Sequence, residues 1–170
     1  NGKLARAIKM VDLAAKAKAD YIKFQTFIPE NLSQKKMNLA KYQKVNCQFS
    51  DQLKMLKKYS LKYEDFKKIK ARCIKKKIKF MTSPFDEESI KIIKKLKVEF
   101  VKIPSGEITN VPLLRSIGNL KKKIILSTGM SNLQEIKKAI EILVKSGAKK
   151  NNISVLHCNT QYPADSSKLN

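Results

Sequence analysis

The feature that most constrains the fold of this chain is a regular alternation between short strand-like segments and longer segments of helical period. The strand-like segments are rich in β-branched and aromatic residues: Tyr21–Thr26, Ile78–Thr82, Phe100–Ile103, Ile124–Ser127 and Ile153–Cys158. Apolar residues recur every three or four positions between them, as on one face of a helix. Strand alternating with helix predicts a parallel sheet whose strands are covered by helices.

The helical segments also carry signals for where they start and stop. Apolar stripes predict helices at Lys3–Lys18, Glu64–Lys76 and Glu87–Leu96, a short helix opening near Pro112, and a last helix ending near Ser146. Asp86 is expected to cap the helix that follows it. Ser131 and Gln134 have the spacing of a capping box for the last helix.

A closed barrel and an open doubly wound sheet both fit this pattern. The chain contains no GxGxxG or GxxxxGKS/T motif, so a dinucleotide-binding sheet is disfavoured. A full (β/α)8 barrel needs eight strands and about 250 residues. We therefore predict an α/β fold in which residues 1–170 form a partial TIM barrel, the catalytic domain, with about five β/α units.

Composition argues against several other classes of protein. The 37 Lys and Arg against 14 Asp and Glu give a net charge of +23, but nearly all of it is lysine and no aromatic residues alternate with it. This favours a solvated basic surface, so we expect no nucleic-acid partner. No apolar run approaches the roughly 20 residues that cross a bilayer, so we expect no membrane partner. Cys47, Cys73 and Cys158 are widely spaced and odd in number, which argues against disulfides or zinc and suits a cytoplasmic location.

Polar side chains stand at the carboxyl end of every strand-like segment, where a core strand normally stays apolar. Alternate residues of a strand share a face, so if Ile22 and Phe24 face the helices, Lys23 and Gln25 both enter the barrel. A buried lysine without a counterion is costly, so a bound phosphate or carboxylate is expected nearby. Lys102 raises the same question on another strand.

Alternatives to an anion site stay open for each of these residues. Either lysine could reach solvent or pair with a carboxylate such as Glu107. Glu107 could neutralise Lys102 or accept hydrogen bonds from substrate hydroxyls. His157, the only histidine, is more typical of a core or hydrogen-bonding residue than of a metal ligand, so we assign no metal ligand in the chain.

The segment Phe27–Ser50 breaks the alternation because it is long and irregular. Long loops in compact domains are usually functional or disordered. In a barrel this loop would follow a strand at the carboxyl-terminal mouth, where substrates bind. We predict that it is a lid.

Taken in chain order, the strand ends resemble those of the sialic acid synthase family, which includes the legionaminic and pseudaminic acid synthases. The resemblance is carried by Lys23–Thr26 (KFQT), Phe80–Asp86 (FMTSPFD), Lys102–Asn110 (KIPSGEITN), Ile125–Met130 (ILSTGM) and Leu156–Pro163 (LHCNTQYP). Their order and spacing hold over essentially the whole chain.

The resemblance implies a TIM barrel that joins phosphoenolpyruvate (PEP) to N-acetylmannosamine or a diacetamido-trideoxyhexose, giving a nine-carbon 2-keto sugar acid. By resemblance, PEP would be held by Lys23, Ser83, Lys102, Ser105, Ser127 and Thr160, and the sugar by Gln25, Glu107 and Tyr162. Glu107 and Lys102 would also be the catalytic residues. A divalent metal, Mn²⁺ or Mg²⁺, is implied, with its ligands outside this chain.

The sequence departs from the family pattern in several places. Thr82-Ser83 reverses a Ser-Thr order, Thr160 stands where some members have asparagine, and Pro163-Ala164-Asp165 replaces Pro-x-Pro. The resemblance also implies a first strand, last strands with metal-binding histidines, and a C-terminal antifreeze-like domain that this sequence lacks. We therefore expect the chain alone to be inactive and the full-length protein to be a homodimer.

Two other functions compete with this interpretation. One is a barrel aldolase or lyase that uses Lys23 or Lys102 as a Schiff-base nucleophile. The other is a nucleic-acid-binding module driven by the +23 charge, which predicts binding that depends steeply on salt.

Overall fold

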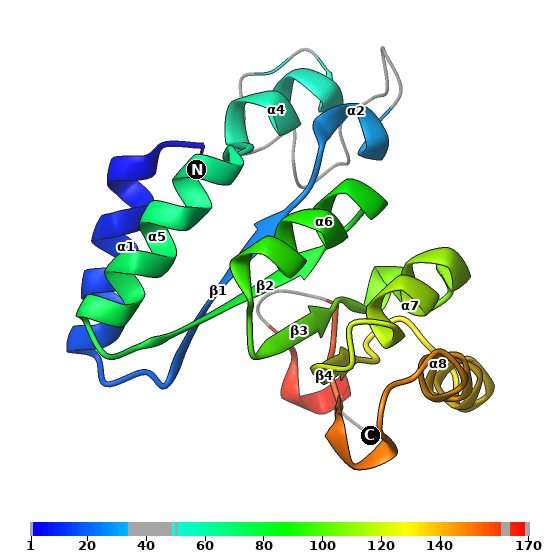
Figure 1. The fold of residues 1–170 in the computed structure, drawn as a ribbon. Helices are drawn as coiled ribbons and strands as arrows, with labels where there is room; N and C mark the ends of the chain where they lie inside the picture. The colour runs from blue at the N-terminus through cyan, green and yellow to red at the C-terminus, as the bar shows by residue number, and fades with distance from the viewer. Residues whose placement is uncertain (1, 34–48, 50, 161–163, 169–170) are drawn as a thin grey trace.

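A computed structural model describes residues 2–33, 49, 51–160 and 164–168 and contains one sheet of five parallel strands (Figure 1). The strands lie side by side in chain order: β1 (Tyr21–Thr26), β2 (Lys79–Pro84), β3 (Phe100–Ile103), β4 (Lys123–Ser127) and β5 (Ile153–Leu156). Every crossover between them contains at least one helix. The predicted α/β class and the partial barrel of five β/α units are confirmed.

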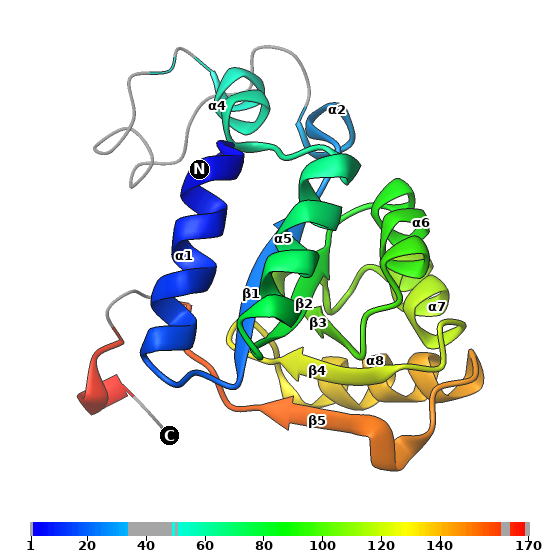
Figure 2. The ribbon, with the colours of Figure 1, turned by 60° about the vertical axis from the view of Figure 1, so that its left-hand side comes forward.

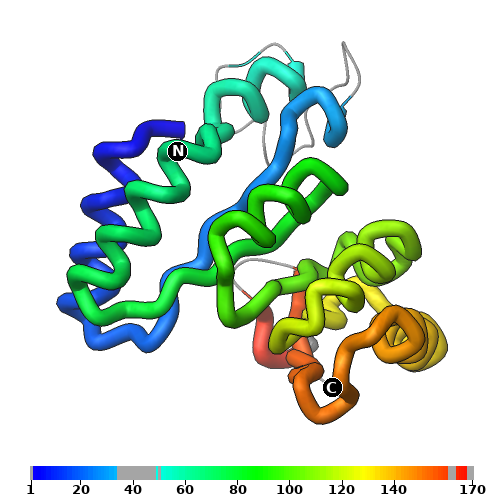
Figure 3. Tube along the Cα trace, in the orientation of Figure 1, coloured from blue at the N-terminus to red at the C-terminus, as the bar shows by residue number. Residues whose placement is uncertain are grey.

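In the described residues, five helices cover one face of the sheet (Figure 2): α1 (Leu4–Lys16), α5 (Tyr63–Lys75), α6 (Glu87–Leu96), α7 (Val111–Gly118) and α8 (Leu133–Lys145). The helices α2 (Pro29–Leu32) and α4 (Gln52–Tyr59) lie beyond the carboxyl end of β1. Successive helices of the covering layer pack on each other, α1 on α5, α5 on α6, α6 on α7 and α7 on α8. The Cα trace in Figure 3 follows this progression from α1 and α5 at one side to α8 at the other. None of the helices in the described ranges is long and apolar enough to cross a membrane.

Strand alternation divides the core from the other side of the sheet. Ile22, Phe80, Val101 and Ile124 point toward the helices and are buried in the hydrophobic core. We call the opposite side of the sheet the inner face, and it carries Lys23, Gln25, Ser83, Lys102 and Ser127. The expectation that Ile22 and Phe24 face the helices is confirmed, because Ile22 belongs to the core and Phe24 packs against it.

The helix starts follow the sequence signals in one case and depart from them in another. Asp86 caps α6, as predicted, by accepting a hydrogen bond from the Ser89 backbone N–H. The predicted capping box of Ser131 and Gln134 is wrong, because Asn132 and Glu135 form it instead. The backbone N–H of Ser131 donates to the Thr128 carbonyl in a turn, which delays the helix by one residue.

The long segment after β1 is only partly helical in the described residues. It opens with α2, whose neighbour is α4. Residues 34–48 and 50 lie outside the described part of the chain, so the lid predicted at Phe27–Ser50 stays a prediction.

Asp86 also fastens the end of β1 to the start of α6. Its carboxylate, which is 8% exposed, accepts hydrogen bonds from the Ile28 N–H at 2.6 Å and the Ser89 hydroxyl at 2.9 Å. The Ser89 hydroxyl also lies 2.9 Å from the Thr26 carbonyl. This buried network fixes the carboxyl end of β1, where Lys23 and Gln25 enter the inner face.

Replacing Asp86 by alanine should destabilise the protein by about 2–3 kcal/mol, because it removes a helix cap and leaves buried N–H groups unpaired. The matched control is Asn132→Ala, which removes a cap whose hydrogen bonds stay within α8 and should cost about 1 kcal/mol. Thermal unfolding of both variants measures the difference. Equal losses would show that the Asp86 link between β1 and α6 contributes nothing.

Candidate active site

The polar residues of the inner face gather at the carboxyl ends of neighbouring strands. Gln25 of β1 is paired in register with Ser83 of β2. Thr82 is paired with Val101, so Ser83 and Lys102, the next residue on each strand, turn to the same side. Ser127 stands two residues beyond Ile125, the partner of Lys102 on β4. Residues from four strands thus share one end of one face.

Lys102 is the central charge of this group. Its Nζ donates hydrogen bonds to the Ile103 carbonyl at 2.9 Å and to the Ser127 hydroxyl. Burial of the ammonium group lowers the pKa of Lys102 to about 8. The positive charge of Lys23 adds to this shift.

Lys23 approaches the same region from β1. Much of its side chain is exposed, yet its surroundings remove enough water to lower its pKa as well. No ion pair joins Lys102 to Glu107, and none is formed by Lys23 with any described carboxylate. The alternative in which Glu107 neutralises Lys102 is therefore wrong for this structure. Two ammonium groups face one region without a carboxylate partner, which suits an anionic ligand.

Ser83 indicates, independently of the two lysines, that the inner face binds a ligand. It is 1% exposed, and its hydroxyl has no hydrogen-bond partner although the oxygen is buried. A buried hydroxyl without a partner loses its hydrogen bonds to water, at a cost of about 1–3 kcal/mol. A phosphate or carboxylate oxygen on the inner face would satisfy it.

Glu107 lies beyond β3 in the short helix η1 (Ser105–Glu107). The Asn110 side-chain amide donates to its carboxylate at 2.8 Å, while the Asn110 side-chain oxygen caps α7. Asn110 therefore orients Glu107, a role that sequence reasoning missed. The signal that could have found it is the spacing of three residues in the Glu-Ile-Thr-Asn segment.

The other candidate residues come after β3 or after β5 in the chain. Ser105 lies in η1, directly after β3, and Thr160 is exposed beyond β5. His157 was expected to be a core or hydrogen-bonding residue; it is exposed, so the core role is wrong and the hydrogen-bonding role stays a prediction. Tyr162 lies outside the described residues.

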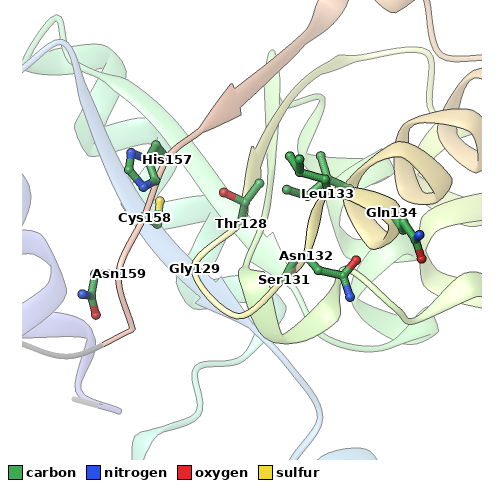
Figure 4. A pocket seen from close by; sticks show the side chains of 10 residues that line it. Thr128, Gly129, Ser131, Asn132, Leu133, Gln134, His157, Cys158 and Asn159 are labelled. Carbon is green, nitrogen blue, oxygen red and sulfur yellow. The ribbon is translucent and has the colours of Figure 1, made fainter. Parts of the chain in front are cut away.

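Two cavities flank the inner-face group. One, of about 480 Å³, lies between β1 and α4 and is lined by Lys23, Gln25, Met55 and Tyr59 among others. The other, of about 890 Å³, lies between the loop after β4 and the segment after β5, with Thr128, Gly129, His157 and Cys158 on its walls (Figure 4). Neither Lys23 nor Lys102 lines the larger cavity, so a choice of site by cavity volume alone would have missed the charged residues.

A divalent metal finds no ready site in this part of the protein. The described residues contain no group of three or more His, Cys, Asp or Glu side chains that could hold one. The inner-face group is built of ammonium and hydroxyl donors, which repel a cation or bind it weakly.

Comparisons with known proteins show the family to which the chain belongs. Residues 10–170 match the NeuB family. N,N'-diacetyllegionaminic acid synthase of Campylobacter jejuni is 44% identical over 100% of this chain and 51% of its own length. The protein of the same name from Legionella pneumophila is 39% identical over 100% of this chain and 49% of its own length.

A solved structure shares the fold as well. The crystal structure of an N-acetylneuraminic acid synthetase from Leptospira borgpetersenii, in complex with citrate, has a TM-score of 0.82 and 30% identity. The match covers 99% of this chain and 54% of that one. The chain spans about half the length of the curated relatives it matches.

Proposed function

Because the chain belongs to the NeuB family, we propose that the complete protein that carries it condenses PEP with an N-acetylated hexosamine. A carbon–carbon bond forms between the PEP methylene and the sugar aldehyde, one water is consumed, and phosphate leaves. The product is a nine-carbon 2-keto sugar acid. The observation that carries the proposal is the pair Lys23 and Lys102, which faces one region without a carboxylate partner, beside the unpartnered hydroxyl of Ser83.

PEP is a small anion with a phosphate and a carboxylate, and the inner face offers the complementary groups. Lys23 and Lys102 would neutralise its charge, and Ser83, Ser105, Ser127 and Thr160 would donate hydrogen bonds to its oxygens. Fixing PEP in this way holds its methylene in one position, which lowers the entropic cost of bond formation.

The sugar would occupy the side of the site nearest β1 and η1. Gln25 lines the cavity under α4, and Glu107 is held by Asn110 at the end of β3. Glu107 would accept a hydrogen bond from a sugar hydroxyl or move a proton during the addition. Tyr162 is proposed to contact the sugar as well.

The family reaction uses a divalent metal, Mn²⁺ or Mg²⁺, which would polarise the sugar aldehyde. The described residues do not form a site for it. A homodimer and a cytoplasmic location, both expected from the sequence, remain predictions.

Phosphate release tests the proposal directly. The complete protein, supplied with PEP, Mn²⁺ or Mg²⁺, and in turn N-acetylmannosamine and a diacetamido-trideoxyhexose, should release phosphate with at least one sugar and none without sugar. Mass spectrometry of the product should show the combined carbon skeleton. Absence of phosphate release with every acetamido sugar would reject the synthase function.

One observation favours the competing Schiff-base aldolase. An amine attacks a carbonyl only when it is unprotonated, and the pKa of Lys102 is lowered to about 8. Borohydride reduction during turnover separates the two functions. The synthase should show no covalent adduct on Lys102 or Lys23, whereas the aldolase would be trapped as a reduced adduct on one of them.

A further inference from the structure

Ser127 accepts two hydrogen bonds at once on the inner face. The Lys102 ammonium group donates one to its hydroxyl oxygen, and the Cys158 thiol donates another with Sγ 3.2 Å from Oγ. Ser127 is 8% exposed, so water has little access to it. The hydrogen bond between Cys158 and Ser127 joins β4 to the segment that follows β5.

The number of lone pairs on a hydroxyl makes this arrangement directional. A serine hydroxyl has two acceptor lone pairs and one proton to donate. With both lone pairs occupied by Lys102 and Cys158, the proton of Ser127 remains for another acceptor. Lys102 cannot be that acceptor, because an ammonium group has none.

The position of Cys158 is fixed by the loop after β4. The Thr128 hydroxyl donates to the Leu156 carbonyl at 2.9 Å, which holds the segment that leads to Cys158. A Cβ at Gly129 would lie 2.9 Å from the Cys158 carbonyl oxygen, so only glycine allows this close approach. Figure 4 shows Thr128 and Gly129 on this loop and Cys158 on the facing segment.

A second observation points to a ligand at this place. Ser83, two strands away on the same face, is 1% exposed and keeps an unpartnered hydroxyl. Lys102 lies on the strand between Ser83 and Ser127. An anion beside Lys102 could therefore accept hydrogen bonds from both hydroxyls.

We propose that Cys158 is a positioning residue of the anion site, whose thiol fixes the Ser127 hydroxyl as a donor toward the anion that Lys102 holds. The inference rests on the proposed function in one respect, which is that the anion is PEP. In this proposal Cys158 does not touch the ligand. It sets the hydrogen-bonding role of Ser127, which does.

The test measures PEP affinity of the complete protein by calorimetry without sugar, so it can be read even if no condensation occurs. Cys158→Ala should weaken binding roughly five- to tenfold, the typical effect of losing one hydrogen bond. Cys158→Ser, which keeps a donor, should restore affinity to within about twofold of the wild type. Cys73→Ala is the matched control, because that thiol is buried in α5 and should leave PEP affinity unchanged.

A double-mutant cycle separates positioning from a purely structural role. In a Ser127→Ala background, Cys158→Ala should cause no further loss of PEP affinity, because the hydroxyl it positions is gone. An equal loss in both backgrounds, or no rescue by serine, would overturn the proposal. Unchanged affinity of Cys158→Ala beside tight wild-type binding would overturn the positioning role alone, whereas no PEP binding by the wild type would overturn the proposed function with it.

Discussion

Lys102→Ala should weaken PEP binding by the complete protein about 100-fold, the largest effect expected of any single substitution in the chain. Removing one partner of a desolvated charge pair costs about 2–5 kcal/mol, and each 1.4 kcal/mol is a tenfold change in affinity. Lys102 is half-buried and hydrogen-bonded to the Ile103 carbonyl and Ser127, so its ammonium group is held in place before the anion arrives. Calorimetric titration with PEP measures the loss.

The matched control is Lys123→Ala, which removes the same charge from the same face of the neighbouring strand. Lys123 is paired in register with Phe100, so it stands at the amino end of the strands. There it forms an ion pair with Glu99 and lies over the Phe100 ring. PEP affinity of this variant should stay within about twofold of the wild type. Equal losses in both variants would mean that general surface charge, rather than a formed site, attracts PEP.

The affinity for PEP should fall as pH rises through about 8, the value to which burial lowers the pKa of Lys102. The sign follows from the charge: lysine is positive below its pKa, and only the ammonium form neutralises the anion. Above that pH the charged fraction falls about tenfold per unit, so affinity should fall by up to about tenfold per unit. Because a bound anion favours the ammonium form, binding above pH 8 should also take up a proton.

Titrations between about pH 7 and pH 10, in buffers of different ionisation enthalpy, measure both the affinity and the proton uptake. Lys102→Arg is the control, because a guanidinium group keeps its charge over this range. That variant should bind PEP more weakly at pH 7 but lose the decline above pH 8. A wild-type affinity that stays constant to about pH 10 would show that Lys102 is not the titrating group.

The sequence predicted the elements of the fold well because the period of apolar residues reports burial. All the strand-like segments became neighbours in one parallel sheet, and Asp86 caps its helix as expected. Strand ends were less accurate: β2 continues to Pro84, which fits at the end of a strand because its missing N–H is not needed there. The capping box shifted by one residue because the Thr128–Ser131 turn uses the Ser131 N–H.

The candidate site was harder to predict because its contacts join residues that are distant in the chain. The sequence indicated that Lys102 and Ser127 matter, but the hydrogen bond between them spans 25 positions and no local pattern specifies it. For Cys158, 31 positions from Ser127, the sequence argued only against a disulfide or a zinc site. The sequence left open an ion pair between Lys102 and Glu107, but the Asn110 side-chain amide donates a hydrogen bond to the Glu107 carboxylate instead.

The central claim is that two ammonium groups, on β1 and β3, hold the same anion. Without a bound anion the charge of Lys23 lowers the pKa of Lys102. The two side chains therefore interact electrostatically, although β2 lies between their strands. If one ligand relieves this repulsion, the effects of removing the two charges on its affinity must depend on each other.

The most direct measurement is the dissociation constant of PEP for the wild type, Lys23→Gln, Lys102→Ala and the double variant. Each single substitution should weaken PEP binding at least about tenfold. The loss of binding free energy in the double variant should be smaller than the sum of the two single losses, because either substitution alone already removes the repulsion that the anion relieves. Wild-type affinity in the Lys23→Gln protein would mean that Lys23 does not contact the anion, and the account of a shared site would be contradicted.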